Sequence, residues 1–384
     1  MSLLMRINAL HADPVIKCVR ILYLKYYSRE EQAIMAKQLM KGNEAMAEAA
    51  LRCGSRFYSG YPITPQTEIL EYLSWRMPEI GGKVVQTESE LSAISMLYGA
   101  ASAGARAFTS TSGPGFSLCQ EGISYIASAD LPLVVINVMR EGAGLGNIGA
   151  SQGDYWQMTR GGGHGDYRMI VLAPHRVQEG ADLIGKAFEL AEKYQHPVLI
   201  ASDAAVGQMV EGVELPEFEE HDINKFDWAV RGCEKGEKPR AIQNTYFMDD
   251  DYENHQRQKY ADIIENEQRW ECVQVEDADI VLVSYGISAR MCKEAVKIAR
   301  DNGMKLGLIR LITLWPFPEK GFEAINPNVK AYLSVEMSTL GQVVDDIKLA
   351  TKCSKPVYNF GSMMALPESD DIIAKAEEIL KEVE

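Results

Sequence analysis

Short apolar runs alternate with segments of helical length from residue 35 to about residue 218, and this alternation constrains the fold more than any other feature of the chain. Residues 131–139, 171–173 and 198–201 are three such runs. Continuously apolar runs are typical of strands that are buried on both faces, and strands separated by helices pair in parallel. We therefore expect an α/β domain with a parallel sheet over residues 35–218.

A second α/β unit is expected at residues 271–384. Its pattern is a strand at 280–286, a helix from about 289 to 301 and a strand at 307–311. Residues 219–270 are polar, turn-rich and then charged, which predicts a linker that contains a helix. Residues 1–34 fit neither pattern, and we expect them to be a non-native or disordered N-terminal extension.

A loop with two prolines lies at residues 60–65, with the sequence GYPITP. Each proline fixes its own φ at about −65° and biases the preceding residue toward an extended conformation. Tyr61 and Thr64 are therefore expected to lie outside any helix. The loop should be rigid, with the Thr64 hydroxyl placed to bind a ligand.

Two carboxylates, Glu88 and Glu90, precede residues 91–101, a stretch rich in apolar and small residues. The stretch predicts a buried helix packed tightly against a neighbour, so a carboxylate at its start should be shielded from water. Burial raises the pKa of a carboxyl group, and a carboxyl that holds a proton near neutrality suits acid–base work. The alternative is an acid in the first turn that complements the helix dipole, which we favour for Glu88.

Arg140 directly follows the apolar run at 131–139. Ligands of open α/β sheets bind at the carboxyl ends of the strands, and a guanidinium binds a carboxylate through two parallel hydrogen bonds. This predicts an anion-binding arginine, with a salt bridge at a subunit interface as the alternative. Residues 141–146 are not a dinucleotide fingerprint, because their spacing is G-x-G-x-G rather than G-x-G-x-x-G at the start of a helix.

The order of these motifs, with residues 104–107 (GARA), 109–115 (TSTSGPG) and 152–154 (QGD), resembles the alpha-type subunit of 2-oxoacid:ferredoxin oxidoreductases from about residue 35 to the C-terminus. The resemblance implies a pyrimidine-type thiamine diphosphate domain at 35–218 and a transketolase C-terminal-like domain at 271–384. The implied complex converts a 2-oxo acid, coenzyme A and oxidised ferredoxin to acyl-CoA, CO₂ and reduced ferredoxin. A self-contained thiamine enzyme and a noncatalytic scaffold are less favoured alternatives.

The resemblance also assigns roles to residues. The activating glutamate of the family lies nine residues before the glycine of its helix, here Gly99, which selects Glu90. Glu90 would bond the aminopyrimidine ring of thiamine diphosphate and favour the tautomer that generates the nucleophilic ylid. Thr64 and Arg140 are implied to bind the carboxylate of the 2-oxo acid. The residues implied to contact the cofactor are Tyr61, Pro62, Ile63 and Glu90.

Two motifs are absent from the sequence. The seven cysteines include no C-x-x-C, whereas iron–sulfur clusters need closely spaced thiolates. The Gly-Asp-Gly motif that binds metal and diphosphate in thiamine enzymes is also missing. The resemblance therefore implies that a beta-type subunit holds Mg²⁺ and the diphosphate at a shared site. It further implies iron–sulfur clusters in a delta-type subunit or ferredoxin, and a further small subunit.

Composition fits a cytoplasmic enzyme subunit. The net charge of −15 disfavours nucleic-acid binding, and no apolar stretch is long enough to cross a membrane. The six histidines have no H-x-x-x-H spacing, so no metal bound by this chain is expected. His164 lies among glycines at 161–166, and both a structural and a ligand-binding role stay open for it.

Residues 152–157 and 161–168 look most like the branched-chain type, whose substrate is 2-oxoisovalerate (3-methyl-2-oxobutanoate). A 2-oxoglutarate enzyme would need an additional cation for the distal carboxylate, and Arg160 or Arg168 is available to supply it. The 2-oxoglutarate alternative therefore stays open.

Overall fold

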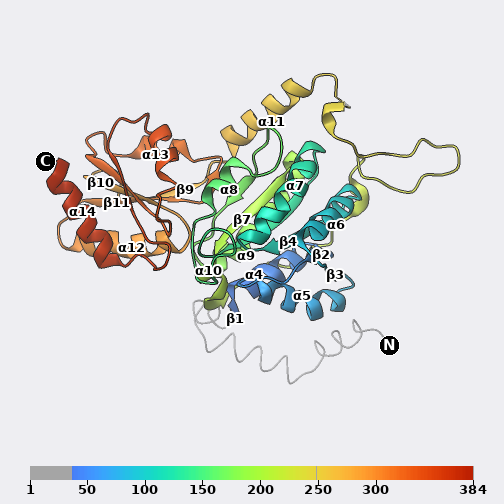
Figure 1. Ribbon diagram of the computed structural model, residues 1–384, viewed down its shortest axis with the longest axis horizontal. Coiled ribbons are helices and arrows are strands. Elements are labelled where there is room, and N and C mark those ends of the chain that lie inside the picture. The colour runs from blue at the N-terminus through green and yellow to red at the C-terminus, as the bar shows by residue number, and fades with distance from the viewer. Residues whose placement is uncertain (1–36, 248, 384) are drawn as a thin grey trace, which may run out of the picture.

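The computed structural model describes residues 37–247 and 249–383, which form two main sheets flanked by helices (Figure 1). The expectation for residues 1–34 lies outside the described residues. None of the helices in the described part is long and apolar enough to cross a membrane. The second sheet lies to one side of the first, beside the C-terminal helix (Figure 1).

The first sheet has seven strands in the order β12-β6-β7-β5-β4-β2-β3. Its strands are β2 (Phe57–Gly60), β3 (Lys83–Gln86), β4 (Ala107–Thr111), β5 (Leu133–Met139), β6 (Ile170–Leu172), β7 (Pro197–Asp203) and β12 (Thr313–Trp315). The neighbouring strands are parallel except β12, which runs antiparallel to β6. The prediction of a parallel α/β sheet is confirmed, whereas the sequence did not predict β12.

Helices cover both faces of this sheet. They are α4 (Gly42–Arg52), α5 (Thr67–Glu79), α6 (Glu90–Ser102), α7 (Pro114–Ser128), α8 (Tyr155–Arg160), α9 (Val177–Tyr194) and α10 (Ala204–Gln208). Val134 and Ile136 of β5 belong to one core with α4, α5 and α9, whereas Leu133 and Val135 belong to another with α6, α7 and α8. This alternation explains why β5 is apolar throughout.

The second sheet has five strands in the order β14-β13-β10-β11-β9. They are β9 (Trp270–Val273), β10 (Ile280–Ser284), β11 (Leu306–Leu311), β13 (Ala331–Val335) and β14 (Val357–Phe360). The helices of this unit are α12 (Gly286–Asp301), α13 (Val344–Ala350) and α14 (Ser369–Val383), and it also contains the 3₁₀ turn η3 (Glu319–Ala324). Only β9 is antiparallel to its neighbour. The two predicted strands are β10 and β11, and the predicted helix is α12, which begins three residues earlier than expected, at Gly286.

The connection between the two units contains the 3₁₀ turns η1 (Ile223–Lys225) and η2 (Thr245–Phe247) and the helix α11 (Tyr252–Asn266). The strand just before this connection is β8 (Val210–Val213). It pairs with β1 (Gln38–Lys41) in a small antiparallel sheet. Residues 219–270 thus contain the predicted helix. The domain boundaries at 219 and 271 stay predictions.

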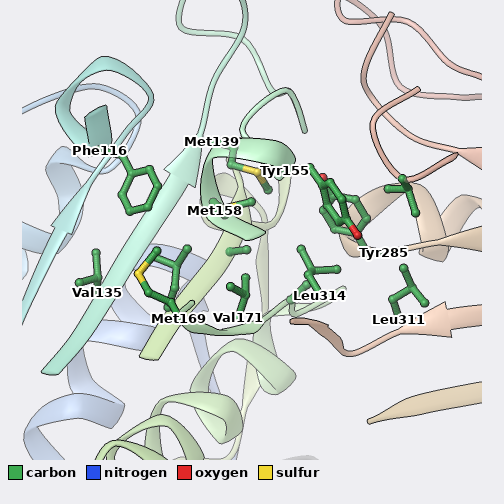
Figure 2. Close-up of a cluster of buried hydrophobic side chains, with 14 of the residues drawn as sticks. Phe116, Val135, Met139, Tyr155, Met158, Met169, Val171, Tyr285, Leu311 and Leu314 are labelled. Atoms are coloured by element: carbon green, nitrogen blue, oxygen red, sulfur yellow. The ribbon is translucent and has the colours of Figure 1, made fainter. Parts of the chain in front are cut away.

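The two units share one hydrophobic core (Figure 2). Met139 and Tyr155 of the first unit belong to the same cluster as Tyr285, Leu311 and Leu314 of the second. The Tyr155 and Tyr285 rings have centroids 5.8 Å apart. Burial of apolar area across this joint fixes the second unit against the first.

A buried carboxylate lies at the same joint. Asp203, the last residue of β7, accepts hydrogen bonds from the backbone N–H of Val206 (2.9 Å) and, across the joint, from that of Ile287 (2.8 Å). Gly286 has φ +57°, and a Cβ there would lie 2.5 Å from Asp203 Oδ2, so glycine is needed for this approach. Burial raises the pKa of Asp203 to about 6, although the bonds from Ile287 and Val206 act to lower it.

We expect Asp203 to make stability depend on pH. Its folded-state pKa of about 6 lies above the ordinary 3.8, so the folded state holds this proton more tightly. The free energy of unfolding should therefore fall as the pH rises from about 4 to about 6, and then level off. Asp203→Asn should remove this slope, whereas Asp222→Asn, at the exposed N-cap of η1, should keep it. Urea unfolding at several pH values measures both, and an unchanged slope in Asp203→Asn would contradict the assignment.

Candidate active site

Glu90 is the first residue of α6 and is 5% exposed. Ser89 caps the helix by accepting a hydrogen bond from the Ser92 N–H (3.4 Å). The Glu90 carboxylate lies against α7, because a Cβ added to Gly115 would be 2.2 Å from Glu90 Oε1 and 2.3 Å from Thr111 Oγ1. Only glycine at position 115 leaves room for the carboxylate, so the predicted burial of Glu90 is confirmed.

Burial raises the pKa of Glu90, while its own backbone N–H and the positive charge of Arg140 act in the opposite direction. A carboxyl group in this setting holds its proton at a higher pH than a surface glutamate does. Glu88, by contrast, is exposed, and its pKa is lowered by a hydrogen bond from the Ser92 hydroxyl. The prediction that Glu88 lies in the first turn is wrong by two residues, because it precedes the N-cap Ser89.

The helix predicted at 91–101 is present and packs closely against α7, but only one of its sides is buried in the described chain. Ile94 and Leu97 of α6 are buried, but Leu91 (43% exposed) and Met96 (42%) face outward, and no side chain or distant backbone lies within 4 Å of a Cβ built on Gly99. The stretch is apolar on all sides, yet the described chain covers only one of them. Leu118 (46%) and Tyr125 (60%) are similarly exposed on α7.

We use the name α6–α7 face for these four exposed apolar side chains: Leu91, Met96, Leu118 and Tyr125. Helices α6 and α7 pack side by side, and their buried sides contribute to the same core on the same side of the first sheet. Their opposite sides therefore both point to solvent beside Glu90. Exposed apolar surface is a common feature of protein–protein contact sites.

Arg140 directly follows β5 and is 8% exposed. Its Nη1 donates to the backbone carbonyl of Thr64 (2.8 Å) and its Nη2 to that of Leu145 (2.7 Å). The structure thus brings Thr64 and Arg140 together as predicted, but through the Thr64 carbonyl, while the Thr64 side chain is exposed. Arg140 forms no ion pair within the described part of the chain, and the alternative of a salt bridge to another subunit stays open.

The loop at 60–65 is irregular, as predicted, and is held by a hydrogen bond from Gln66 Nε2 to the Tyr61 carbonyl (3.0 Å). Tyr61 is 38% exposed, and Pro62 and Ile63 are half-buried. The loop therefore offers backbone and ring surface to a ligand at the carboxyl end of β2.

Four buried polar atoms around this site have no hydrogen-bond partner: Thr111 Oγ1, Ser112 Oγ, Asn137 Oδ1 and Arg140 Nε. Thr111 lies beside Glu90, and Gly113 lies beside Arg140, with an added Cβ 3.6 Å from Nε. Buried polar atoms are normally paired, so unpaired ones near Glu90 and Arg140 fit a site that a polar ligand completes. The sequence motif at 109–115 contains Thr111 and Ser112, but no role had been predicted for either residue.

Asp154 is a further residue of the site that the sequence did not single out. Its Oδ2 accepts a hydrogen bond from Asn137 Nδ2 (2.9 Å) on β5. Burial raises the pKa of Asp154, and the Asn137 bond and the Arg140 charge act to lower it. Asp154 therefore lies within electrostatic range of the arginine. The sequence feature that could have identified Asp154 is its position in the motif at 152–154.

The remaining candidates lie elsewhere. Arg160 forms an ion pair with Asp346 (2.8 Å), and Arg168 Nη1 donates to the Thr159 carbonyl, so both guanidinium groups have partners in their own chain. His164 lines a separate cavity of about 270 Å³ together with Tyr252. The structure does not bring His164 to Glu90 or Arg140.

Comparisons with known proteins agree with this geometry. Residues 48–274 match the family "pyruvate flavodoxin/ferredoxin oxidoreductase, thiamine diphosphate-binding", and residues 278–365 match "pyruvate:ferredoxin oxidoreductase core domain II". The ketoisovalerate oxidoreductase subunit VorB of Methanothermobacter marburgensis is 48% identical, over 91% of this chain and 99% of its own. The 2-oxoglutarate synthase subunit KorA of Archaeoglobus fulgidus is 36% identical, over 87% and 97%.

Solved structures resemble most of the chain. The 2-oxoglutarate:ferredoxin oxidoreductase of Magnetococcus marinus, with 2-oxoglutarate, coenzyme A and succinyl-CoA bound, superposes with a TM-score of 0.77 and 25% identity, covering 89% of this chain and 65% of its own. A split-gene transketolase shares the fold, with a TM-score of 0.58, 14% identity and coverage of 90% and 99%. The chain therefore belongs to the 2-oxoacid:ferredoxin oxidoreductases, as an alpha-type subunit with a thiamine diphosphate-binding domain.

Proposed function

We propose that this chain is the thiamine diphosphate-activating subunit of an enzyme that oxidatively decarboxylates 2-oxoisovalerate with coenzyme A, giving acyl-CoA, CO₂ and reduced ferredoxin. One observation carries the catalytic part: a water-shielded carboxylate, Glu90, lies within electrostatic range of Arg140, whose buried Nε has no partner. Two relatives named as ketoisovalerate oxidoreductase subunits are each 48% identical to the chain and support the choice of substrate.

The residues present fit the cofactor, because unpaired buried polar atoms and the Gly115 cradle surround Glu90. Glu90 would share a proton between its carboxyl group and the aminopyrimidine ring of thiamine diphosphate, and Tyr61, Pro62 and Ile63 would line the cofactor site from the loop. Thiamine diphosphate, when bound, supplies the nucleophilic carbon and the electron sink for decarboxylation. Burial excludes water from this exchange and strengthens the hydrogen bond.

Arg140 and Thr64 bind the carboxylate of the 2-oxo acid. Two of the five guanidinium N–H groups are already bonded to the Thr64 and Leu145 carbonyls, which fixes the orientation of the group. The Nε–H and the remaining Nη–H groups are available to a carboxylate. Such charge-assisted bonds hold the substrate in one alignment for attack.

The two arginines considered for the distal carboxylate of 2-oxoglutarate, Arg160 and Arg168, each have a partner within the described chain. Arg160 pairs with Asp346, and Arg168 bonds the Thr159 carbonyl. A second carboxylate on the substrate would have to compete with these partners. The branched-chain substrate, whose far end is apolar, needs no such cation.

The complex also needs partners. A beta-type subunit would hold Mg²⁺ and the diphosphate and pack on the α6–α7 face, which is exposed and apolar beside Glu90. Iron–sulfur clusters would lie in a delta-type subunit or ferredoxin, with a further small subunit in the assembly. We propose a cytoplasmic location for this enzyme.

The test is an assay of the co-expressed complex against a panel of 2-oxo acids. We expect kcat/KM for 2-oxoisovalerate to exceed that for 2-oxoglutarate and pyruvate. A higher kcat/KM for 2-oxoglutarate would contradict the proposed substrate and favour the 2-oxoglutarate alternative. The absence of any thiamine-dependent turnover would refute both.

The proposed interface predicts that a charge on the α6–α7 face weakens assembly. Met96→Asp or Leu118→Asp would bury a carboxylate against an apolar partner surface, so we expect the dissociation constant of the complex to rise roughly tenfold or more. Trp75→Asp is the matched control, because Trp75 is also exposed (54%) but lies on α5, across the sheet. Surface-plasmon resonance measures the three variants; equal losses for Trp75→Asp and Met96→Asp would argue against this face.

A shared cofactor site predicts weak binding to the isolated chain. Without the partner's diphosphate and metal ligands, we expect thiamine diphosphate with Mg²⁺ to bind more weakly than about 1 μM. Titration calorimetry on the purified chain measures this affinity. Submicromolar binding would mean that this chain alone forms the site.

A further inference from the structure

A side chain from the second unit is bonded to the active-site segment of the first. Gln342, just before α13, donates from Nε2 to the Gly153 carbonyl (2.7 Å) and accepts at Oε1 from the Trp156 N–H (2.8 Å). The backbone carbonyl of Gln342 also accepts from the Trp156 indole N–H (3.1 Å). Gln342 thus spans the start of α8 and bonds the residues on both sides of Asp154–Tyr155.

Gln342 is itself fixed by a fully buried carboxylate. Glu336, at the end of β13, accepts hydrogen bonds from the N–H of Gln342 (2.9 Å) and Val343 (3.1 Å) and from the hydroxyl of Ser334 (2.7 Å). With both carboxylate oxygens occupied, the backbone at 342–343 is tied to the second sheet. The sheet, Glu336 and Gln342 therefore form one connected support.

The supported segment carries a residue of the site. Asp154 lies between the two positions that Gln342 bonds, and its carboxylate accepts from Asn137 within range of the Arg140 charge. On its other side, α8 is tied to α7 by a bond from Gln157 Nε2 to Ser117 Oγ (2.7 Å). If the Gln342 side-chain bonds are lost, the Gly153 carbonyl loses its donor and the Trp156 N–H loses its acceptor. The bonds of Gln152 to Tyr285 and of Tyr155 to Asp346 remain.

We propose that Gln342, supported by Glu336, is a positioning residue that holds Asp154 within electrostatic range of Arg140 and so sets how tightly the 2-oxo acid carboxylate is bound. The inference rests on the proposed function for the identity of the ligand. Gln342 touches no reacting atom in this scheme. Its loss should therefore weaken substrate binding more than it slows the chemistry.

The kinetic test uses the co-expressed complex. Gln342→Met keeps the volume but removes both side-chain bonds, and we expect KM for 2-oxoisovalerate to rise on the order of tenfold with kcat changed less than about threefold. Gln342→Glu keeps the acceptor for Trp156 and should lie in between. Asn326→Ala is the matched control, because Asn326 Nδ2 bonds only the Ala278 carbonyl within the second unit. A fall in kcat at constant KM, or an equal effect of Asn326→Ala, would overturn the proposal.

Hydrogen–deuterium exchange separates this proposal from the proposed function. In Gln342→Met, peptides covering residues 152–158 should exchange faster than in the wild type, because the Trp156 N–H loses its acceptor. Unchanged exchange would overturn the proposal whatever the kinetics show. Faster exchange of residues 152–158 in a complex that turns over no 2-oxo acid would refute the proposed reaction. It would still show that Gln342 holds this segment in place.

Discussion

Glu90→Gln should reduce turnover of the assembled complex by about 10²–10⁴-fold, the usual effect of removing one acid–base group. Glutamine has the shape of glutamate and fits the space beside Gly115, so the fold should be kept. What is lost is the carboxyl proton, whose affinity is raised by burial on α6. An amide cannot exchange a proton with the aminopyrimidine ring.

The direct measurement is the exchange rate of the C2 proton of bound thiamine diphosphate, because it reports activation before any substrate is present. Glu88→Gln is the matched control: it lies two residues away, is exposed and bonds only Ser92 among the described residues. We expect normal exchange in Glu88→Gln and very slow exchange in Glu90→Gln. Normal exchange in Glu90→Gln, or a larger loss in Glu88→Gln, would refute the role of Glu90.

Local patterns in the sequence were sufficient for much of the fold. The apolar run at 131–139 predicts a strand buried on both faces, and β5 has this form, with Arg140 at its carboxyl end. The two prolines at 62 and 65 predict an irregular loop, which the structure contains. In each case the residues that determine the conformation are adjacent in the chain, so the sequence displays the cause directly.

Features that depend on distant contacts were not predictable in this way. β12 pairs with β6 although more than 140 residues separate them, and Gln342 meets Gly153 across 189 residues. The outward side of α6 is as apolar as its buried side, so no pattern in this chain reveals which side is covered. Such information lies in the packing of the units, and for α6 in the proposed partner.

For the same reason, only part of the candidate active site could be predicted from the sequence. Glu90 and Arg140 stand next to strong local patterns, but Asp154 joins them only because β5 supplies Asn137 and the second unit holds the segment at 153–156. The Thr64 hydroxyl was predicted to face the ligand pocket, yet the Thr64 carbonyl makes the contact with Arg140. Side-chain direction at a turn depends on neighbours that the local sequence does not specify.

Arg140→Lys should lower kcat/KM roughly tenfold to a hundredfold, since a charge-assisted bond contributes about 1.5–3 kcal/mol. Lysine keeps the positive charge but has no planar fork. It cannot bond the Thr64 and Leu145 carbonyls at once in the same geometry and still present a parallel pair of N–H groups to a carboxylate. The substrate should bind more weakly and lie less well aligned for attack.

Arg231→Lys provides the control for a general loss of structure. The Arg231 guanidinium also donates to two backbone carbonyls, those of Asn224 and Phe226, and also has a buried Nε without a partner, but it lies in the connection after β8. Its replacement should leave kcat/KM within about threefold, as surface changes usually do. Because every 2-oxo acid carries the same C1 carboxylate, Arg140→Lys should affect all accepted substrates to a similar degree. A loss confined to a dicarboxylic substrate would mean that Arg140 reads the distal carboxylate, and the 2-oxoglutarate alternative would then be preferred.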